Sequence, residues 1–132
     1  KDVVSVSVDA TIEEAALLMC THKIGGMPVI SSVGAVVGVI TETDIFKTFV
    51  DVMGLADGKT RLTLEVQNKP GTVKEIAEIF TELGLNIDSL ITCKKEDGKY
   101  EIVIRGDFVA APSLTGRLED KGFKVIHTVQ IG

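Results

Sequence analysis

The sequence predicts an α+β fold built from two units of different design. The first 55 residues read as strand, helix, strand, strand, helix, and the residues from 61 onward read as βαββαβ. The segment 61–67 alternates strictly between apolar and polar side chains, which is typical of a sheet with one buried face. The second unit is therefore expected to have a ferredoxin-like plan, with its helices on one side of an antiparallel sheet.

Composition and charge exclude several classes of function. The 132 residues are 45% hydrophobic but only 5% aromatic, so we expect ordered units with mainly aliphatic cores. The formal net charge is -5, and residues 1–55 hold three lysines against seven acidic residues. Neither half offers a basic face for nucleic acid or for an anionic membrane. No apolar run approaches the about 20 residues of a membrane span, and no secretory signal opens the chain.

The two cysteines, Cys20 and Cys93, are far apart and form no C-x-x-C pair. Two such thiols fit a reducing cytoplasm and buried, unpaired roles, so we predict a cytoplasmic protein. The chain begins at Lys1, already inside an apolar strand pattern. We therefore expect it to be a piece of something longer.

The first unit, residues 1–55, is predicted from helix start and stop signals around short apolar strands. Thr11 and Glu14 have the spacing of a capping box that opens a helix. The apolar stripe of this helix includes Cys20, and the Gly25–Gly26 pair is expected to stop it. The expected elements are an extended lead-in at 2–8, a helix from residue 11, strands at 27–30 and 36–40, and a helix at 41–53.

A unit of this size is expected to need a partner. About 55 residues bury only about 60% of their unfolded surface and are marginal alone. The predicted strands are apolar on both faces, so one layer of helices cannot cover them. The remainder of the chain does not repeat the pattern. We therefore expect the missing cover to be a second chain or an upstream copy of the same motif.

The second unit fills residues 61–132 after a short polar linker at 56–60. Thr72 has the sequence context of another capping box, and Asp97-Gly98 is a strong hairpin signal between two strands. His127 falls on the apolar face of the last predicted strand, where we expect a hydrogen-bonded core or interface residue. The expected elements are strands at 61–67, 86–95, 99–106 and 123–131, and helices at 72–83 and 112–122.

The stretch Val36–Asp44 is the candidate functional segment of the first unit. A short apolar strand turns directly into a helix there, and the side chains of Thr41, Thr43 and Asp44 surround the first turn. Free N–H groups and short polar side chains at such a junction suit a ligand with hydroxyls or phosphate. The alternative is structural, because Thr41 and Asp44 have nearly the spacing of a capping box. The residues alone leave both interpretations open.

Residues 1–55 resemble a CBS motif, through Thr11-x-x-Glu14-Ala15, Met27-Pro28-Val29 and Gly38-Val-Ile-Thr41-Glu-Thr-Asp44. The resemblance implies an adenosine-binding site in a motif that works as one of a pair. It implies that Thr41 and Asp44 hold the ribose, since a carboxylate accepts charge-assisted bonds from hydroxyls. It assigns the apolar flanks of the adenine to Ile24, Met27, Pro28 and Ile40.

The net negative charge of this unit limits how much negative charge its expected ligand can carry. Its basic side chains are Lys1, Lys23, Lys47 and His22, and Glu42 adds negative charge beside the expected phosphate position. A polyphosphate is therefore disfavoured unless a partner copy supplies cations, and an adenosine moiety with little charge is favoured. An adenosine nucleotide or S-adenosylmethionine is expected as a regulatory ligand, and no catalytic cofactor is expected.

Residues 61–132 resemble an ACT domain, through Asn68-Lys-Pro70-Gly71 and Gly84-Leu-Asn86-Ile87. The resemblance implies binding of a small amino acid, often at a dimer interface made by sheets lying side by side. The loop and the following helix N-terminus would present N–H groups to its carboxylate, and Asn68 or Asn86 would address its amino group. The alternative is a tight turn in which Gly71 takes a positive φ. The implied set is Asn68, Pro70, Gly71, Thr72, Asn86 and Ile87.

The succession of the two motifs resembles the CBS–ACT regulatory proteins of bacteria, including the acetoin-utilisation type. We therefore expect a non-catalytic, allosteric homodimer that senses small-molecule effectors, with no nucleic-acid or membrane partner and a downstream target that the sequence does not name. The chain has no nucleophile–base set, supported acid pair, P-loop or metal cluster. His22 and His127 lack partners at metal-ligand spacing. The alternatives are a ligand-free oligomerisation domain and a small acyl- or phospho-hydrolase on the ferredoxin-like half.

Overall fold

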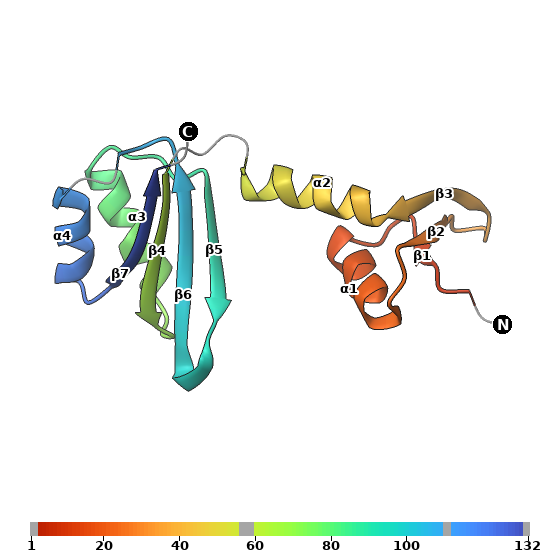
Figure 1. Ribbon diagram of the computed structural model, residues 1–132, viewed down its shortest axis with the longest axis horizontal. Coiled ribbons are helices and arrows are strands. Elements are labelled where there is room, and N and C mark those ends of the chain that lie inside the picture. Colours follow the sequence, from red (N-terminus) through yellow and green to blue (C-terminus); the bar gives the residue numbers. More distant parts are fainter. Residues whose placement is uncertain (1–2, 56–59, 110–111, 131–132) are drawn as a thin grey trace. The chain divides into compact units, whose positions relative to one another are not determined.

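The computed structural model describes residues 3–55, 60–109 and 112–130, and the chain divides into two compact units, Lys1–Val52 and Met53–Gly132. The predicted linker at 56–60 falls, apart from Thr60, outside the described residues. Both units combine helices with strands, as Figure 1 shows. The predicted α+β class is confirmed.

The first unit has the predicted order of strand, helix, strand, strand, helix. Its three strands form one sheet in the order β1-β2-β3, with β1 parallel to β2 and β2 antiparallel to β3. The sequence could specify this small sheet because each strand is a short apolar run bounded by turn residues. The elements are β1 (Val6–Ser7), α1 (Ile12–His22), β2 (Gly26–Ile30), β3 (Val36–Thr41) and α2 (Glu42–Met53).

The two ends of α1 illustrate one correct and one wrong prediction. Thr11 caps its start, because its hydroxyl accepts a bond of 3.1 Å from the N–H of Glu14. The helix does not run to the Gly25–Gly26 pair. It ends at His22, where Lys23 takes the left-handed conformation with φ 54° and ψ 48°. The N–H groups of Lys23 and Ile24 both bond to the carbonyl of Met19, and these bonds offset the cost of a side chain in that conformation.

The core of the first unit is small and lies between α1 and the sheet. Partly buried apolar residues, among them Ile24, Ile40 and Ile45, pack around it. Cys20 was expected in this core, and that expectation is wrong: Cys20 is exposed, as is Cys93 in the second unit, and both thiols are free. The buried members are Val6, Ala15, Met19 and Met27.

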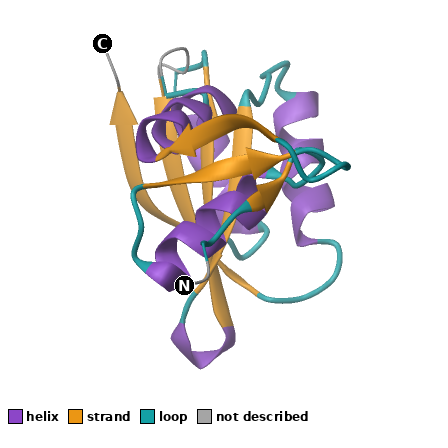
Figure 2. Ribbon diagram, turned by 90° about the vertical axis from the view of Figure 1, so that its right-hand side faces the viewer, coloured by secondary structure: helices purple, strands orange, loops and turns teal. Residues whose placement is uncertain are grey.

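The second unit confirms the ferredoxin-like plan. Its four strands are all antiparallel in the order β5-β6-β4-β7. Both helices, α3 and α4, lie on the same face of this sheet (Figures 1 and 2). The elements are β4 (Thr60–Gln67), α3 (Thr72–Glu82), β5 (Ser89–Lys94), the short 3-10 helix η1 (Glu96–Gly98), β6 (Lys99–Gly106), α4 (Pro112–Asp120) and β7 (Lys124–Gln130).

The core of the second unit lies between the sheet and the two helices. The strict alternation of β4 predicted it, since Leu62, Leu64 and Val66 all point into it. The helices contribute the side chains that the 3.6-residue period places on one face. The buried members are Leu62, Leu64, Val66, Ile76, Ile79, Phe80, Ile102, Ile104, Phe108, Leu114, Leu118 and Phe123.

Turn chemistry in the second unit was partly predicted. Asp97 and Gly98 both take positive φ values, 64° and 72°, so the hairpin between β5 and β6 is confirmed. The capping box at Thr72 is wrong. Gly71 precedes the helix with φ 92°, and the hydroxyl of Thr72 donates to the carbonyl of Lys69 at 3.0 Å. A hydroxyl used in this way holds the preceding turn rather than the helix N–H groups.

The last strand departs from its predicted alternation. The pairing of β7 with β4 shifts by one residue between Thr63 and Leu64, which is a β-bulge. Val125 therefore pairs with Leu64 on the core side, whereas His127 pairs with Thr63 on the opposite face. The expectation that His127 shares a face with Val125 is wrong, and its exposed side chain is not part of the core. Its expected role as an interface residue stays a prediction.

Candidate functional site

The junction of β3 and α2 is a closed set of hydrogen bonds between Thr41 and Asp44. The N–H and the hydroxyl of Thr41 donate to Oδ2 of Asp44 at 2.8 and 3.0 Å. The N–H of Asp44 donates to the hydroxyl of Thr41 at 3.4 Å. This is the reciprocal arrangement of a capping box, so the structural role predicted for the pair is present.

The same bonds leave part of the pair available to a ligand. All three involve Oδ2 of Asp44 or the hydroxyl of Thr41, and within the described residues no bond to Oδ1 of Asp44 is formed. Asp44 is exposed. The hydroxyl proton of Thr41 is already donated, so this group can only accept further bonds. The arrangement offers one free carboxylate oxygen in a fixed orientation.

The charge of this carboxylate is maintained by its neighbours. The backbone N–H of Thr41 and then its hydroxyl hold the pKa of Asp44 below its ordinary value of about 3.8, with a smaller contribution from the positive charge of Lys47. Asp44 is therefore ionised at neutral pH. An ionised carboxylate is the stronger acceptor for hydroxyl donors such as those of a ribose.

Three of the four apolar residues predicted around an adenine, Met27, Pro28 and Ile40, lie on β2 and β3, and Ile24 precedes β2. Met27 pairs with Ile40 across β2 and β3, next to the pairing of Gly26 with Thr41. Ile24, Pro28 and Ile40 are partly exposed and can contact a ligand. Met27 is only 2% exposed and belongs to the core, so in this chain its surface is used for packing.

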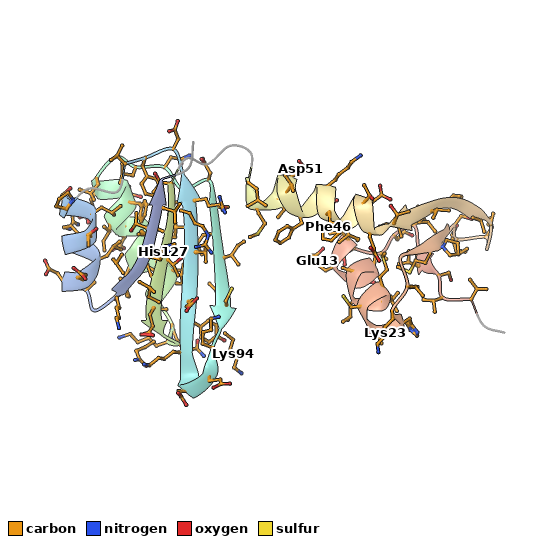
Figure 3. The ribbon with its side chains drawn as sticks, in the orientation of Figure 1. Glu13, Lys23, Phe46, Asp51, Lys94 and His127 are labelled. Atoms are coloured by element: carbon orange, nitrogen blue, oxygen red, sulfur yellow. The ribbon has the colours of Figure 1, made fainter. Side chains whose placement is uncertain are left out.

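A cavity of about 450 Å³ lies between α1 and α2. It includes Ile24 from the predicted set but neither Thr41 nor Asp44. Figure 3 labels two of its residues, Lys23 at the end of α1 and Phe46 on α2. The sequence analysis did not predict this cavity. The signal that could have found it is helical spacing, since residues three and four apart line it from each helix. The lining residues are Ala16, Met19, Cys20, Lys23, Ile24, Glu42, Ile45 and Phe46.

A large apolar surface of the first unit is not covered by the described residues of the chain. None of the described side chains of α2 is buried, although the helix carries two phenylalanines. Along β3, three valines are more than half exposed. We call this set the β3–α2 surface, and it consists of Val36, Val37, Val39, Phe46, Phe49, Val50 and Val52.

The loop between β4 and α3 borders a cavity of about 370 Å³. Its walls include four of the residues predicted to bind an amino acid, namely Asn68, Pro70, Gly71 and Thr72. Gly71 has φ 92°, and a Cβ added to it would meet no atom within 4 Å. The start of α3 has no side-chain cap, so the first-turn N–H groups are open to an anionic group. Val66, Tyr100 and Ile102 supply apolar walls.

The other two residues of that predicted set lie elsewhere in the chain. Asn86 and Ile87 follow the C-terminal end of α3, whereas Gly71 precedes its N-terminal end. The side-chain amide of Asn86 donates to Asp88 at 3.2 Å, and Ile87 packs against the core. One chain therefore does not bring the two halves of the predicted amino-acid site together.

The described residues contain neither a candidate metal centre nor a membrane span. No group of three or more His, Cys, Asp or Glu side chains is positioned to hold a metal ion in this part of the chain. None of its helices has the length and apolar character that crossing a bilayer requires.

Comparison with known proteins assigns both units. The sequence matches the family model of the CBS domain over residues 1–51 and that of the ACT domain over residues 60–123. The chain therefore consists of a CBS domain followed by an ACT domain. Both are regulatory domains, and their combination indicates a regulatory, ligand-sensing module.

A curated relative shares part of the first domain. The chain is 44% identical over 45 residues to an inosine-5'-monophosphate dehydrogenase of Methanocaldococcus jannaschii. The match covers 34% of this chain and 9% of that enzyme. The similarity is confined to the CBS region, so it concerns a domain and not the whole enzyme.

Proposed function

We propose that the protein is a non-catalytic regulatory module whose CBS domain binds an adenosine-containing ligand, either an adenosine nucleotide or S-adenosylmethionine. The observation that carries this proposal is the Thr41–Asp44 pair, which holds an ionised carboxylate with one oxygen that accepts no bond from the described residues. The free oxygen accepts bonds from the ribose hydroxyls, and Ile24, Pro28 and Ile40 flank the adenine. The scarcity of cations in this domain favours ligands with little negative charge over ATP.

Calorimetric titration with AMP, ADP, ATP and S-adenosylmethionine tests this proposal. Removing a hydroxyl from the ligand, instead of mutating the protein, tests the contact to Asp44 without the risk that a variant misfolds. If Asp44 accepts from the ribose, 2'-deoxyadenosine monophosphate binds more weakly than AMP by about tenfold or more, since a hydrogen bond to a charged group contributes about 1.5–3 kcal/mol. Asp44→Asn keeps an oxygen for Thr41 and removes the charge, so it reduces this discrimination. Asp51→Asn removes a charge from the same helix and leaves binding unchanged. Absence of heat with all four ligands would exclude a nucleotide role.

The ACT domain is proposed to bind a small amino acid in the cavity beside Gly71. The uncapped N–H groups at the start of α3 receive its carboxylate, and Val66, Tyr100 and Ile102 contact its side chain. Because Asn86 and Ile87 lie at the far end of α3, their participation requires a second copy of the chain. This is the physical reason for placing the site at a dimer interface.

A pair of glycines provides a matched test of the amino-acid site. Gly71 and Gly84 both have positive φ, 92° and 72°, and both have open space around an added Cβ. Alanine at either position therefore introduces similar backbone strain, but only Gly71→Ala places a methyl group at the cavity. Thermal shifts across a panel of amino acids should disappear in Gly71→Ala and persist in Gly84→Ala. Loss in both variants, or in neither, would contradict this site.

The proposed assembly is a homodimer in the cytoplasm. The β3–α2 surface is large and apolar, which is typical of an interaction site, and two exposed free thiols, Cys20 and Cys93, fit a reducing compartment. Ligand binding would shift the equilibrium between two dimer arrangements if the ligand's affinity for the two arrangements differs.

A connection to acetoin utilisation rests on the order of the two domains, and growth on acetoin of a strain carrying Asp44→Ala would test it.

A ligand-free oligomerisation domain is the second candidate, and the closed Thr41–Asp44 capping box favours it. A ligand at 100 times its dissociation constant stabilises the folded state by about 2.7 kcal/mol, which is readily seen as a rise in melting temperature. A stable dimer whose melting temperature is unchanged by nucleotides and amino acids would support this second function over the first.

A further inference from the structure

The ACT sheet has an open face whose residues follow from the register of its strands. Because α3 and α4 cover one face and Leu62 and Leu64 point toward them, the alternate residues of β4 point to the other face. These are Arg61, Thr63 and Glu65. The strand pairings then place the partners of each residue on the same face. Neither α3 nor α4 covers this face (Figure 1). At the edge of the face, the hydroxyl of Ser89, which pairs with Arg105, donates to the carbonyl of Met53 at 3.0 Å.

Two arginines lie side by side at one level of this face. Arg61 on β4 is directly opposite Arg105 on β6, and like charges in that position are destabilising. Nη1 of Arg61 donates to the hydroxyl of Thr63 at 2.9 Å, while Nε of Arg105 is buried and has no acceptor among the described residues. Within that part of the chain, neither guanidinium forms an ion pair with a carboxylate. Among the described residues, this arginine pair therefore has one hydroxyl acceptor and no carboxylate acceptor.

Two glutamates lie side by side four residues farther along the same strands. Glu65 is directly opposite Glu101, again with like charges adjacent. Each has one lysine nearby, Lys99 at 3.9 Å from Glu65 and Lys95 at 3.8 Å from Glu101. Those separations exceed hydrogen-bond length, so both carboxylates retain capacity to accept hydrogen bonds.

The arginine pair and the glutamate pair are complementary under one twofold rotation. An axis parallel to the plane of the sheet and just above its open face, perpendicular to the strands and level with Thr63 and Val103, places one copy face to face on another. It lays Arg61 of each copy over Glu65 of the other, and Arg105 over Glu101. An axis parallel to the strands would instead place arginine over arginine. The level between the two pairs holds Thr63 and Val103, which are only 6% and 9% exposed, beside the half-buried Ile91. The charged pairs and Ile91 therefore supply the contact, and the two central residues add little area.

We propose that the open face of the ACT sheet binds a second copy of this chain face to face, through the Arg61–Glu65 and Arg105–Glu101 contacts in this antiparallel register. The contact is self-complementary, as a twofold interface requires. It supplies carboxylate acceptors to the two guanidiniums, and Arg–carboxylate pairs have favourable bidentate geometry. It uses none of the residues proposed for the nucleotide or the amino acid.

The area of the open face sets the expected affinity of one copy for another. Four strands about 4.8 Å apart and about six residues long offer on the order of 400 Å² per copy, about half of the about 800 Å² per partner in a standard interface. We therefore expect association in the micromolar range. It should weaken at high salt, because the contacts that define the register are ionic.

Charge reversal in the full chain tests this contact. Arg105→Glu or Glu101→Arg alone turns both Arg105–Glu101 contacts of the dimer into like-charge pairs and should raise the dissociation constant about tenfold or more. The double variant Arg105→Glu/Glu101→Arg restores opposite charges and should return it to within about threefold of the original. Sedimentation velocity over the micromolar range measures the average mass. Asp120→Arg, a charge reversal on the exposed end of α4, is the matched control and should have no effect.

The same variants are repeated in a Phe49→Ser background, so that a dimer held by the β3–α2 surface cannot conceal the effect. Rescue by the double variant supports the proposal, because a merely structural role of either residue would not be restored by the exchange. Average masses that do not respond to either single reversal in both backgrounds would overturn it, as would failure of the double variant to restore association. Nucleotide and amino-acid titrations of these variants report separately on the proposed function.

Discussion

Asp44 combines the capping of α2 with a proposed ligand-binding role in one carboxylate. Oδ2 completes the cap of α2, and this bonding fixes the direction of the remaining oxygen. The sequence predicted the pair, because Thr41 and Asp44 are three residues apart at the start of an apolar helix pattern. It could not separate the capping role from the ligand role, since both depend on the same residue types. The hydrogen bonds show that capping uses one oxygen and leaves the other.

The titration of Asp44 should reveal this bonding directly. Its folded-state pKa lies below the ordinary value of about 3.8, so its contribution to stability is complete above that pH and is lost as the pH falls through the folded pKa. We expect a carboxyl titration midpoint below 3.8 by NMR. Thr41→Val should raise the midpoint only partly, because the backbone N–H of residue 41 is the larger cause and remains.

Asp51→Asn is the control for this measurement, because it removes a charge from α2 without touching the Thr41–Asp44 bonds. It should leave the midpoint of Asp44 unchanged. A midpoint at or above 3.8 in the original protein would mean that the capping bonds do not persist in solution.

Other residues show why single positions are harder to predict than elements. Lys23 ends α1 although two glycines follow closely, because the bonds to Met19 form as soon as one residue takes the left-handed conformation. Cys20 is exposed because α1 has only one covered face, and the buried positions Ala15 and Met19 define it. Thr72 was predicted as a cap from spacing alone, yet Gly71 takes that position because its positive φ suits the preceding turn.

At the level of elements, strand β4 was the most predictable part of the chain. Its period of two identified both the core face and the open face, and every pairing with β6 follows without a shift. The neighbouring β7 was less predictable, since its bulge depends on the partner strand. A one-residue shift exchanges the faces of the residues beyond it, which is why His127 and the core-facing Val125 do not share a side.

Gly106, the last residue of β6, lies where any side chain would collide with its neighbours. An added Cβ would lie 2.7 Å from the carbonyl oxygen of Asn86 and from two ring atoms of Phe108. Phe108 cannot easily move, because its ring packs edge to face on Phe80 with centroids 5.3 Å apart. Gly106→Ala should therefore destabilise the ACT domain by about 1–3 kcal/mol, the usual cost of overpacking.

Gly116 in α4 supplies the matched comparison, since a Cβ there would meet no atom within 4 Å. Gly116→Ala should stabilise the domain by about 0.5–1 kcal/mol through helix propensity. Urea unfolding of both variants measures the two changes. Equal effects of the two substitutions would show that the close approach at Gly106 relaxes without cost.

At the level of the whole molecule, the two units differ in how completely their own chain covers them. Among the described residues, the core of the ACT domain has twelve buried members, whereas that of the CBS domain has four. The sequence anticipated this difference, because strands that are apolar on both faces cannot be covered by one helix layer. Whether the expected cover is a second chain or an upstream copy of the motif is not encoded by any pattern within these residues.

The β3–α2 surface should therefore control self-association without contributing to the core of the single chain. Val39 and Phe49 are 65% and 52% exposed, so Val39→Ser and Phe49→Ser remove few intrachain contacts. We expect each to raise the dissociation constant of the dimer by about tenfold or more, since burying one large apolar side chain contributes about 1.5–3 kcal/mol. The secondary structure of the diluted monomer, followed by circular dichroism, should not change.

Leu17→Ser is the control for this prediction, because Leu17 on α1 is 68% exposed but lies outside the β3–α2 surface. It should leave the dissociation constant unchanged in sedimentation equilibrium. If all three variants weaken the dimer equally, general loss of surface hydrophobicity explains the result and the surface has no special role. If none does, the apolar strands of the CBS domain are covered by another part of the same chain, and the argument that this domain needs a partner fails.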